Sequence, residues 1–139
     1  LLGFELAAAW RPITTIEGLE LFGTASTTRS NEESVVPSVP FQWRTGSRYS
    51  VPQPEGYRVR RWFGQLALFG ASDSEDAGRG SDAYVSADLL LGTGIDLRCG
   101  RGFWMNVGVT NLLDEDYTPA TSLLPVTGIS FLIGGGFQF

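Results

Sequence analysis

The last twelve residues, Gly128 to Phe139, alternate in character more clearly than any other segment. Large apolar side chains gather at odd-numbered positions: Ile129, Phe131, Ile133, Phe137 and Phe139. The even-numbered positions are small or polar apart from Leu132. Successive side chains of a β-strand point to opposite faces, so this pattern predicts a strand with one apolar, aromatic-ended face. An exposed apolar strand templates aggregation in water, and contact with lipid removes that problem.

The composition favours strands over helices and excludes several classes of protein. Glycine (18 residues) and aromatic residues (12%) are abundant, and no run approaches the ~18–20 apolar residues of a membrane helix. The net charge of −5 argues against a nucleic-acid partner, which requires clustered Lys and Arg. The chain begins Leu-Leu-Gly-Phe, without an initiator Met or a signal sequence, so we expect a piece of a longer protein.

An enzyme is the least supported class. The single cysteine, Cys99, cannot form an internal disulfide, although Arg98 and Arg101 beside it carry the charge that activates a thiol. The chain holds no histidine to act as a base, and no motif places a pair of carboxylates. We therefore predict no catalytic residue, no cofactor and no metal site.

Periodicity predicts about seven β-strands and no helix. The strands are expected over about these ranges: Gly3–Arg11, Leu19–Thr28, Phe41–Val51, Arg58–Gly70, Ala83–Leu97, Phe103–Thr110 and Gly128–Phe139. The fourth is the least regular, because Phe63 and Phe69 share the parity of Gln65. Its other large apolar residues take the opposite parity: Trp62, Leu66 and Leu68.

The predicted connections alternate between short and long. The short ones are Pro12–Gly18, Pro52–Gly56 and Cys99–Gly102, and the longer ones are Arg29–Pro40, Ala71–Asp82 and Asn111–Thr127. Strands of about 9–15 residues exceed the 5–6 typical of globular sheets and suit a tilted membrane crossing. This pattern is typical of an outer-membrane barrel. A soluble antiparallel sandwich or a lipocalin-like barrel also alternates and stays an alternative.

The polar residues of the predicted strands share the parity opposite the apolar row: Glu5, Arg11, Glu20, Gln42, Arg44, Arg48, Gln65, Asp88, Asp96, Asn106 and Gln138. A narrow barrel would have to pack these groups into a filled interior, which is costly for unpaired charges. The predicted fold is therefore all-β, an antiparallel up-and-down meander of about seven long strands that forms the closing section of a large transmembrane β-barrel. We expect one outward apolar band containing Phe4, Trp10, Trp43, Leu89, Val107 and Phe131.

A motif near the C-terminus resembles the end of TonB-dependent outer-membrane receptors. That family shows a strand leading into an Asn-Leu-Leu-Asp-type run and a tyrosine, then a loop and a closing aromatic strand. The matching residues here are Asn111, Leu112, Leu113, Asp114 and Tyr117, followed by Pro119. Val39-Pro40 is similar to the family's proline-led entry to an earlier hairpin, whereas Thr127-Gly128 departs from the usual loop exit.

The resemblance implies that residues 1–139 are the C-terminal part of a receptor barrel of about 22 strands. The plug domain, the TonB box and the earlier strands would lie upstream. It implies location in the outer membrane of a Gram-negative bacterium and uptake of a scarce nutrient such as a metal–siderophore complex, cobalamin, haem or a glycan. Lipid, a TonB-type energy-coupling protein and the outer-membrane assembly machinery are the implied partners. Phe131, Phe137 and Phe139 would form the assembly signal, and the ligand-binding residues stay unknown.

The motif also has a physical interpretation. Asn111 and Asp114 can hydrogen-bond nearby backbone and fold the chain as it leaves the strand. Leu112 and Leu113 can cover the barrel rim, and Tyr117 suits the aromatic girdle at a membrane interface.

Two further runs are assigned no ligand. We expect Asp114, Glu115 and Asp116 to face solvent rather than to bind calcium, which needs six to eight oxygen ligands. Gly134 to Gly136 is not a phosphate cradle, because no helix follows it. The glycines instead allow the strand to curve or another group to approach its face.

Two alternatives are a small complete porin-like barrel and a soluble β-sandwich binding module. Single-chain bacterial barrels use even strand numbers, so an odd number of strands with two bare edges argues against a complete barrel. Pairing of Gly3–Arg11 with Ile129–Phe139 inside this chain would contradict the prediction of a fragment.

Overall fold

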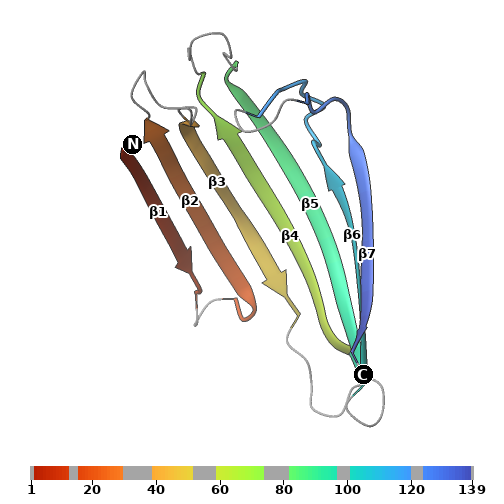
Figure 1. Ribbon diagram of the computed structural model, residues 1–139. Coiled ribbons are helices and arrows are strands. Elements are labelled where there is room, and N and C mark those ends of the chain that lie inside the picture. The colour runs from red at the N-terminus through yellow and green to blue at the C-terminus, as the bar shows by residue number, and fades with distance from the viewer. Residues whose placement is uncertain are drawn as a thin grey trace.

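The computed structural model describes residues 2–12, 16–29, 39–51, 59–73, 82–96, 101–119 and 124–138, which form one curved sheet of seven antiparallel strands (Figure 1). In chain order the strands are β1 (Leu2–Trp10), β2 (Leu19–Arg29), β3 (Val39–Ser50), β4 (Val59–Ala71), β5 (Tyr84–Asp96), β6 (Gly102–Thr110) and β7 (Ser130–Gln138). Each pairs with its neighbours in sequence. The predicted all-β meander is confirmed, and every strand boundary lies within two residues of its predicted place.

No helix in the described part of the chain is long and apolar enough to cross a membrane.

The two ends of the sheet differ in their connections. Residues 11–18, 51–58 and 97–101 join strands at the end that we call the short-connection end. Residues 30–38, 72–83 and 111–129 join them at the opposite, long-connection end, which is uppermost in Figure 1. The predicted alternation of connections is confirmed. Cys99 and Phe139, to which the sequence directs attention, lie outside the described residues.

Strand register divides the side chains into an apolar face and a polar face, because directly paired residues point to the same side of a sheet. The apolar face holds Phe4, Trp10, Leu21, Trp43, Tyr49, Trp62, Leu66, Leu89, Val107, Phe131 and Phe137. The polar face holds Glu5, Glu20, Gln42, Arg44, Arg48, Gln65, Asp88 and Asn106. Among the side chains described on the apolar face, none is charged. The six residues of the predicted apolar band therefore share one face.

Neither face is covered by a second layer of described structure. The buried apolar residues are small: Ala67, Ala71 and Ala87. Phe4 is 60% exposed and Phe131 is 82% exposed. The chain exposes 10323 Å², whereas a compact protein of its mass would expose roughly 7,100 Å². The apolar face is thus not the inside of a packed core within this chain.

Large side chains on the polar face lie over glycines of the neighbouring strand. The directly paired positions are Phe22–Gly46, Phe63–Gly92, Trp104–Gly136, Asn106–Gly134 and Leu132–Gly108. A Cβ at Gly136 would lie 2.7 Å from Trp104 Nε1. The Gly134–Gly136 run therefore admits side chains of β6, as one of the two sequence interpretations expected. This pairing with a glycine also explains why Phe63 and Leu132 lie on the polar face, opposite the main apolar row of their strands.

Rows of directly paired residues cross the sheet with a strong stagger. One row begins at the short-connection end of β1 and finishes near the long-connection end of β6: Trp10, Leu21, Ser47, Leu66, Leu89 and Val109. From Phe103 to Val109 the chain rises ~20 Å, while the strand spacings from β1 to β6 cover ~24 Å. A row of paired residues therefore makes an angle of roughly 40° with the line through the strand ends. Because the rows run perpendicular to the strands, the strands tilt by the same angle from the perpendicular to that line.

We expect Gly46→Ala to destabilise the sheet, because the added Cβ would lie 2.3 Å from the Leu66 carbonyl oxygen and 2.7 Å from Phe22 Cζ. The overlap should lower the free energy of unfolding by ~1–3 kcal/mol. Gly94→Ala is the matched control, since its Cβ would lie 3.9 Å from Phe103 O and should change stability by less than ~0.5 kcal/mol. Urea unfolding followed by tryptophan fluorescence measures both, and equal stability of the two variants would contradict the register.

Candidate functional site

The most deeply buried large side chains in the described structure are polar, and they meet where β6 ends. Asn111 is 1% exposed and Ser86 is fully buried. Asn111 Oδ1 accepts hydrogen bonds from Ser86 Oγ (2.9 Å) and from the Glu115 N–H (3.2 Å). Asn111 Nδ2 donates to the carbonyls of Glu115 (2.8 Å) and Gly128 (3.0 Å). We call Ser86, Asp88, Asn111, Glu115 and Gly128 the Asn111 cluster.

The Asn111 cluster ties three segments together. The Asn111 backbone N–H donates to Asp88 Oδ1 of β5 at 3.2 Å, and the Leu112 N–H donates to the Ala87 carbonyl at 2.8 Å. The bond to the Gly128 carbonyl adds the approach to β7. One amide side chain thus fixes the start and the end of the connection 111–129 against β5.

The backbone of the turn explains the residue types in the motif. Asn111 and Asp114 both have φ of 55°, a left-handed conformation that Asn and Asp tolerate better than most residues. The Asp114 N–H donates to the Asn111 carbonyl at 3.0 Å. The expected side-chain bonds to nearby backbone are confirmed for Asn111, whereas Asp114 joins the turn through its backbone N–H.

Tyr117 occupies a different place from the predicted one. Its ring stacks on Tyr84 with centroids 4.0 Å apart, and Phe69 meets both rings edge-on at 6.3 and 6.4 Å. Tyr84 and Phe69 belong to the polar face, so the Tyr117 ring does not stand on the apolar face, where an aromatic girdle at a membrane interface would lie. The physical reason is the backbone bridge between Tyr117 and Val126, which folds this connection back over β5. Burial, with Tyr84 and Asp88 nearby, raises the pKa of the Tyr117 phenol.

The other motif residues lie at the surface. Leu112 and Leu113 are exposed, as are Asp114, Glu115 and Asp116. The described residues contain no group of three or more His, Cys, Asp or Glu side chains that could hold a metal ion. Phe131 and Phe137 stand on the apolar face near opposite ends of β7.

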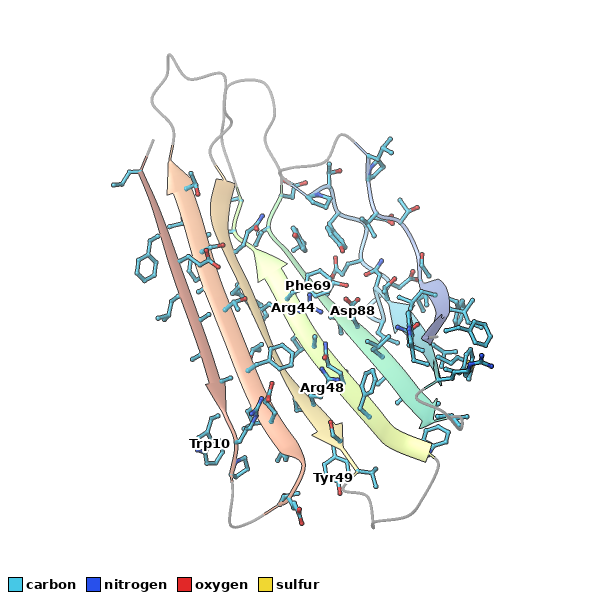
Figure 2. All side chains as sticks on the ribbon, turned by 60° about the horizontal axis from the view of Figure 1, so that its bottom comes forward. Trp10, Arg44, Arg48, Tyr49, Phe69 and Asp88 are labelled. Carbon is cyan, nitrogen blue, oxygen red and sulfur yellow. The ribbon has the colours of Figure 1, made fainter. Side chains whose placement is uncertain are left out.

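A hollow of about 210 Å³ lies on the polar face beside the aromatic stack. Its lining residues are Thr24, Ser26, Gln42, Trp43, Arg44, Phe69, Gly70, Tyr84 and Asp88. Figure 2 shows Arg44, Phe69 and Asp88 close together on adjoining strands. The Arg44 guanidinium carbon lies 6.0 Å from the centroid of the Phe69 ring.

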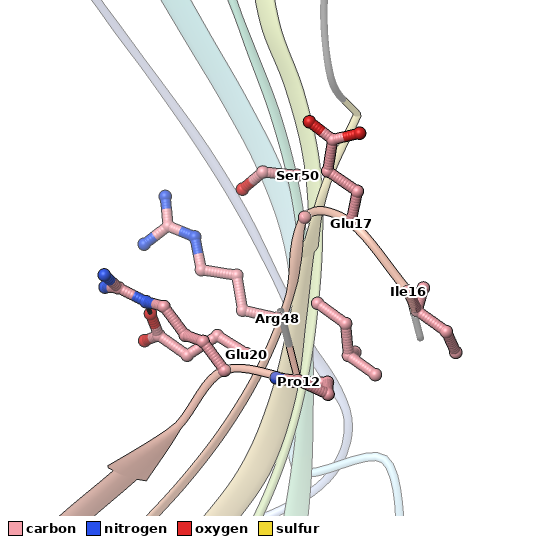
Figure 3. Close-up of a pocket in the computed structure, with 9 residues that line it drawn as sticks. Pro12, Ile16, Glu17, Glu20, Arg48 and Ser50 are labelled. Atoms are coloured by element: carbon pink, nitrogen blue, oxygen red, sulfur yellow. Dashed lines mark hydrogen bonds and ion pairs between the residues drawn. The ribbon is translucent and has the colours of Figure 1, made fainter. Parts of the chain in front are cut away.

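A second hollow, of about 700 Å³, lies toward the short-connection end (Figure 3). Arg48 and Glu20 project to the same side of the backbone, while Glu17 and Ile16 project away from them. Arg11 Nε pairs with Glu20 Oε2 at 2.5 Å, although Arg11 is 75% exposed. The Arg48 guanidinium carbon stands 4.4 Å from the Phe63 ring centroid. Each hollow is therefore lined by an arginine that lies over a phenylalanine ring, and the ring itself lines only the smaller hollow.

Sequence reasoning identified Asn111 as important but missed its partners. Ser86 and Asp88 are 25 and 23 residues earlier in the chain and meet Asn111 only through the β5–β6 pairing. The placement of Arg44 and Arg48 over Phe69 and Phe63 also depends on register. The irregular parity of Phe63 and Phe69 was the available signal for that arrangement.

Comparisons with known proteins assign no family. A scan against protein-family models, a search of curated proteins and a search of solved structures each found no match to this chain. Its function must therefore be inferred from the residues and their geometry.

We expect Asn111→Gly to loosen the connection 111–129 while keeping the turn, because glycine accepts the positive φ but removes the side-chain bonds. Loss of these buried bonds should cost ~1–3 kcal/mol of local stability and speed amide exchange at Tyr117 and Val126. Asp114→Gly is the matched control, since Asp114 has the same φ and an exposed side chain. Equal exchange in the two variants would contradict the role of the Asn111 amide.

Alkaline pH should release the same connection. Burial raises the pKa of Tyr117 above its ordinary value of 10.0. The stability that the neutral phenol gives to the folded connection is therefore fully present below the pKa of the unfolded state. That contribution is lost as pH rises through the folded pKa, because the phenolate must leave the stack. Tyr117→Phe keeps the stack and removes the ionisation. Amide exchange at Val126 between pH 8 and 12 should accelerate more in the wild type, and an identical pH dependence in both proteins would contradict this account.

Proposed function

We propose that the chain is the closing wall section of a large outer-membrane β-barrel, belonging to a TonB-dependent type of receptor that imports a scarce nutrient. The observation that carries this proposal is the uncovered face of seven adjacent strands on which no described side chain is charged. Such a face needs an apolar surrounding along its whole width. A lipid bilayer provides one.

The order of residue types along the apolar face supports contact of that face with a lipid bilayer. Aromatic residues mark the short-connection end of several strands: Trp10, Tyr49, Trp62, Phe103 and Phe137. Another set lies toward the long-connection end: Phe4, Phe41, Trp43 and Phe131. Between them stand mainly aliphatic and small residues such as Leu6, Leu66, Leu89 and Val107. Aromatic girdles that flank an aliphatic band are typical of membrane barrels.

Strand geometry supports the same proposal. The strands contain 9 to 13 residues, and a strand tilted at about 45° needs ~9–11 residues to cross the hydrocarbon core. The tilt of roughly 40° derived from the stagger falls within the range of outer-membrane barrels. A strand set of this length and tilt suits a wall that spans the bilayer.

The open edges favour a fragment over a complete barrel. Within the described residues, β1 pairs only with β2 and β7 pairs only with β6. Both edges therefore need further strands, which a longer chain would provide. The polar face would then line a wide lumen, where the charges of Glu5, Arg44 and Arg48 are solvated. A soluble sandwich would instead need a second sheet over the apolar face.

The receptor part of the proposal is supported by the resemblance of the Asn111–Tyr117 motif to TonB-dependent receptors. A plug, an energy-coupling protein and uptake of a nutrient follow from that resemblance. In such a receptor the Asn111 cluster would hold an extracellular loop in position above the lumen. It has a positioning role and touches no reacting group.

The test uses the full-length gene product expressed in a Gram-negative host. We expect it in the outer-membrane fraction, and we expect the periplasmic domain of an energy-coupling protein to bind it. In planar bilayers it should show no steady conductance, because a plug closes the lumen. Recovery in the soluble fraction would contradict the membrane proposal. Outer-membrane location with a stable open conductance would contradict the receptor and favour a porin-like barrel.

A further inference from the structure

Two arginines of β3 stand on the polar face, and each of them lies over a phenylalanine of β4. Arg44 and Arg48 are four residues apart on one strand, so their Cα atoms are separated by ~13 Å. Arg48 lies over Phe63 of β4 with its guanidinium carbon 4.4 Å from the ring centroid, and Arg44 lies 6.0 Å from that of Phe69. Each ring faces one side of a planar guanidinium group. The N–H donors at the edge of that plane therefore stay available to another partner.

Neither arginine is neutralised within the described part of the chain. The ion pair found there joins Arg11 to Glu20, although Glu20 is the direct cross-strand neighbour of Arg48. Asp88, which lines the hollow of Arg44, accepts the Asn111 N–H. Glu17 also lines the hollow of Arg48, but its side chain projects away from that arginine (Figure 3). Neither guanidinium group thus forms an ion pair within the described residues, and both can bind an anionic partner.

Each arginine also lines a hollow. Arg44 shares the smaller one with hydroxyl and amide donors from Thr24, Ser26 and Gln42. Arg48 shares the larger one, about 700 Å³, with Ser50 and the Arg11–Glu20 pair. The larger hollow, about 700 Å³, falls within the ~300–1,000 Å³ of small-molecule sites, whereas the smaller one, about 210 Å³, has room for a small anionic group only. A planar guanidinium binds a carboxylate or a phosphate through two parallel hydrogen bonds.

We propose that Arg44 and Arg48 form two successive binding stations for a small organic anion that carries a carboxylate or phosphate group. The anion would bind Arg44 nearer the long-connection end and Arg48 nearer the short-connection end. The inference rests on the proposed function in one respect, since the polar face must line a lumen for the stations to lie on a transport path. The Arg44 station adjoins the Asn111 cluster at Asp88, which belongs to both, whereas the Arg48 station shares no residue with the cluster.

The experiment measures binding of succinate and of inorganic phosphate to the full-length protein in detergent micelles by isothermal titration calorimetry. Arg44→Gln and Arg48→Gln should each weaken binding by about tenfold or more, as expected for loss of a charge-assisted pair of hydrogen bonds. Arg101→Gln is the control, because Arg101 is exposed and lines neither hollow. It removes the same charge and should change binding by less than about twofold. Near-UV circular dichroism verifies that each variant is folded.

Arg44→Lys and Arg48→Lys keep the charge but lose the planar fork, so they should bind with intermediate affinity. Tighter binding of succinate than of phosphate would assign a carboxylate, and the reverse would assign a phosphate. Absence of binding of either anion to the wild type would overturn the inference, as would equal weakening by all three glutamine variants. Outer-membrane location is measured separately. Binding by a protein found outside the outer membrane would overturn the proposed function and leave the two stations in place.

Discussion

The rest of the structure depends on one constraint: a single layer of strands has two faces, and the described part of the chain lays no second layer over either of them. In a protein with two packed layers, the apolar face of a sheet is buried by a second element. Here the exposed residues include Trp10, Phe131 and Ile133, and the buried apolar residues are alanines. The stability of the apolar face must therefore come from something outside the described sheet. Lipid on one side and a wide aqueous lumen on the other would satisfy both faces at once.

The polar face carries the chemistry, and it is organised by cross-strand pairing. Glycines opposite Phe22, Phe63 and Trp104 allow large rings to lie flat among charged neighbours. The rings of Phe63 and Phe69 then support Arg48 and Arg44. At the long-connection end the same face ends in the Asn111 cluster and the Tyr84–Tyr117 stack, which fix the connection 111–129. The position of the connection 111–129 and the placement of Arg44 and Arg48 thus both depend on one set of strand registers.

The fold was predictable because alternation along a strand is a local property. Each predicted strand, including the irregular fourth one, lies within two residues of its observed place. Contacts between strands were not predictable, because period-two alternation does not fix which residue faces which. For that reason Ser86 and Asp88 were missed as partners of Asn111. The position of Tyr117 against the polar face was also not predictable, because the bridge to Val126 reverses the connection after the motif.

The natural tryptophans test the central claim that the apolar face meets hydrocarbon. Trp10, Trp43 and Trp62 lie on the apolar face, and Trp104 lies on the polar face. Variants of the full-length protein that retain one tryptophan each can be reconstituted in bilayers of lipids brominated near the headgroup. We expect strong fluorescence quenching for Trp10, Trp43 and Trp62 and little for Trp104. Equal quenching of all four, or quenching of Trp104 alone, would contradict the assignment of the apolar face to lipid.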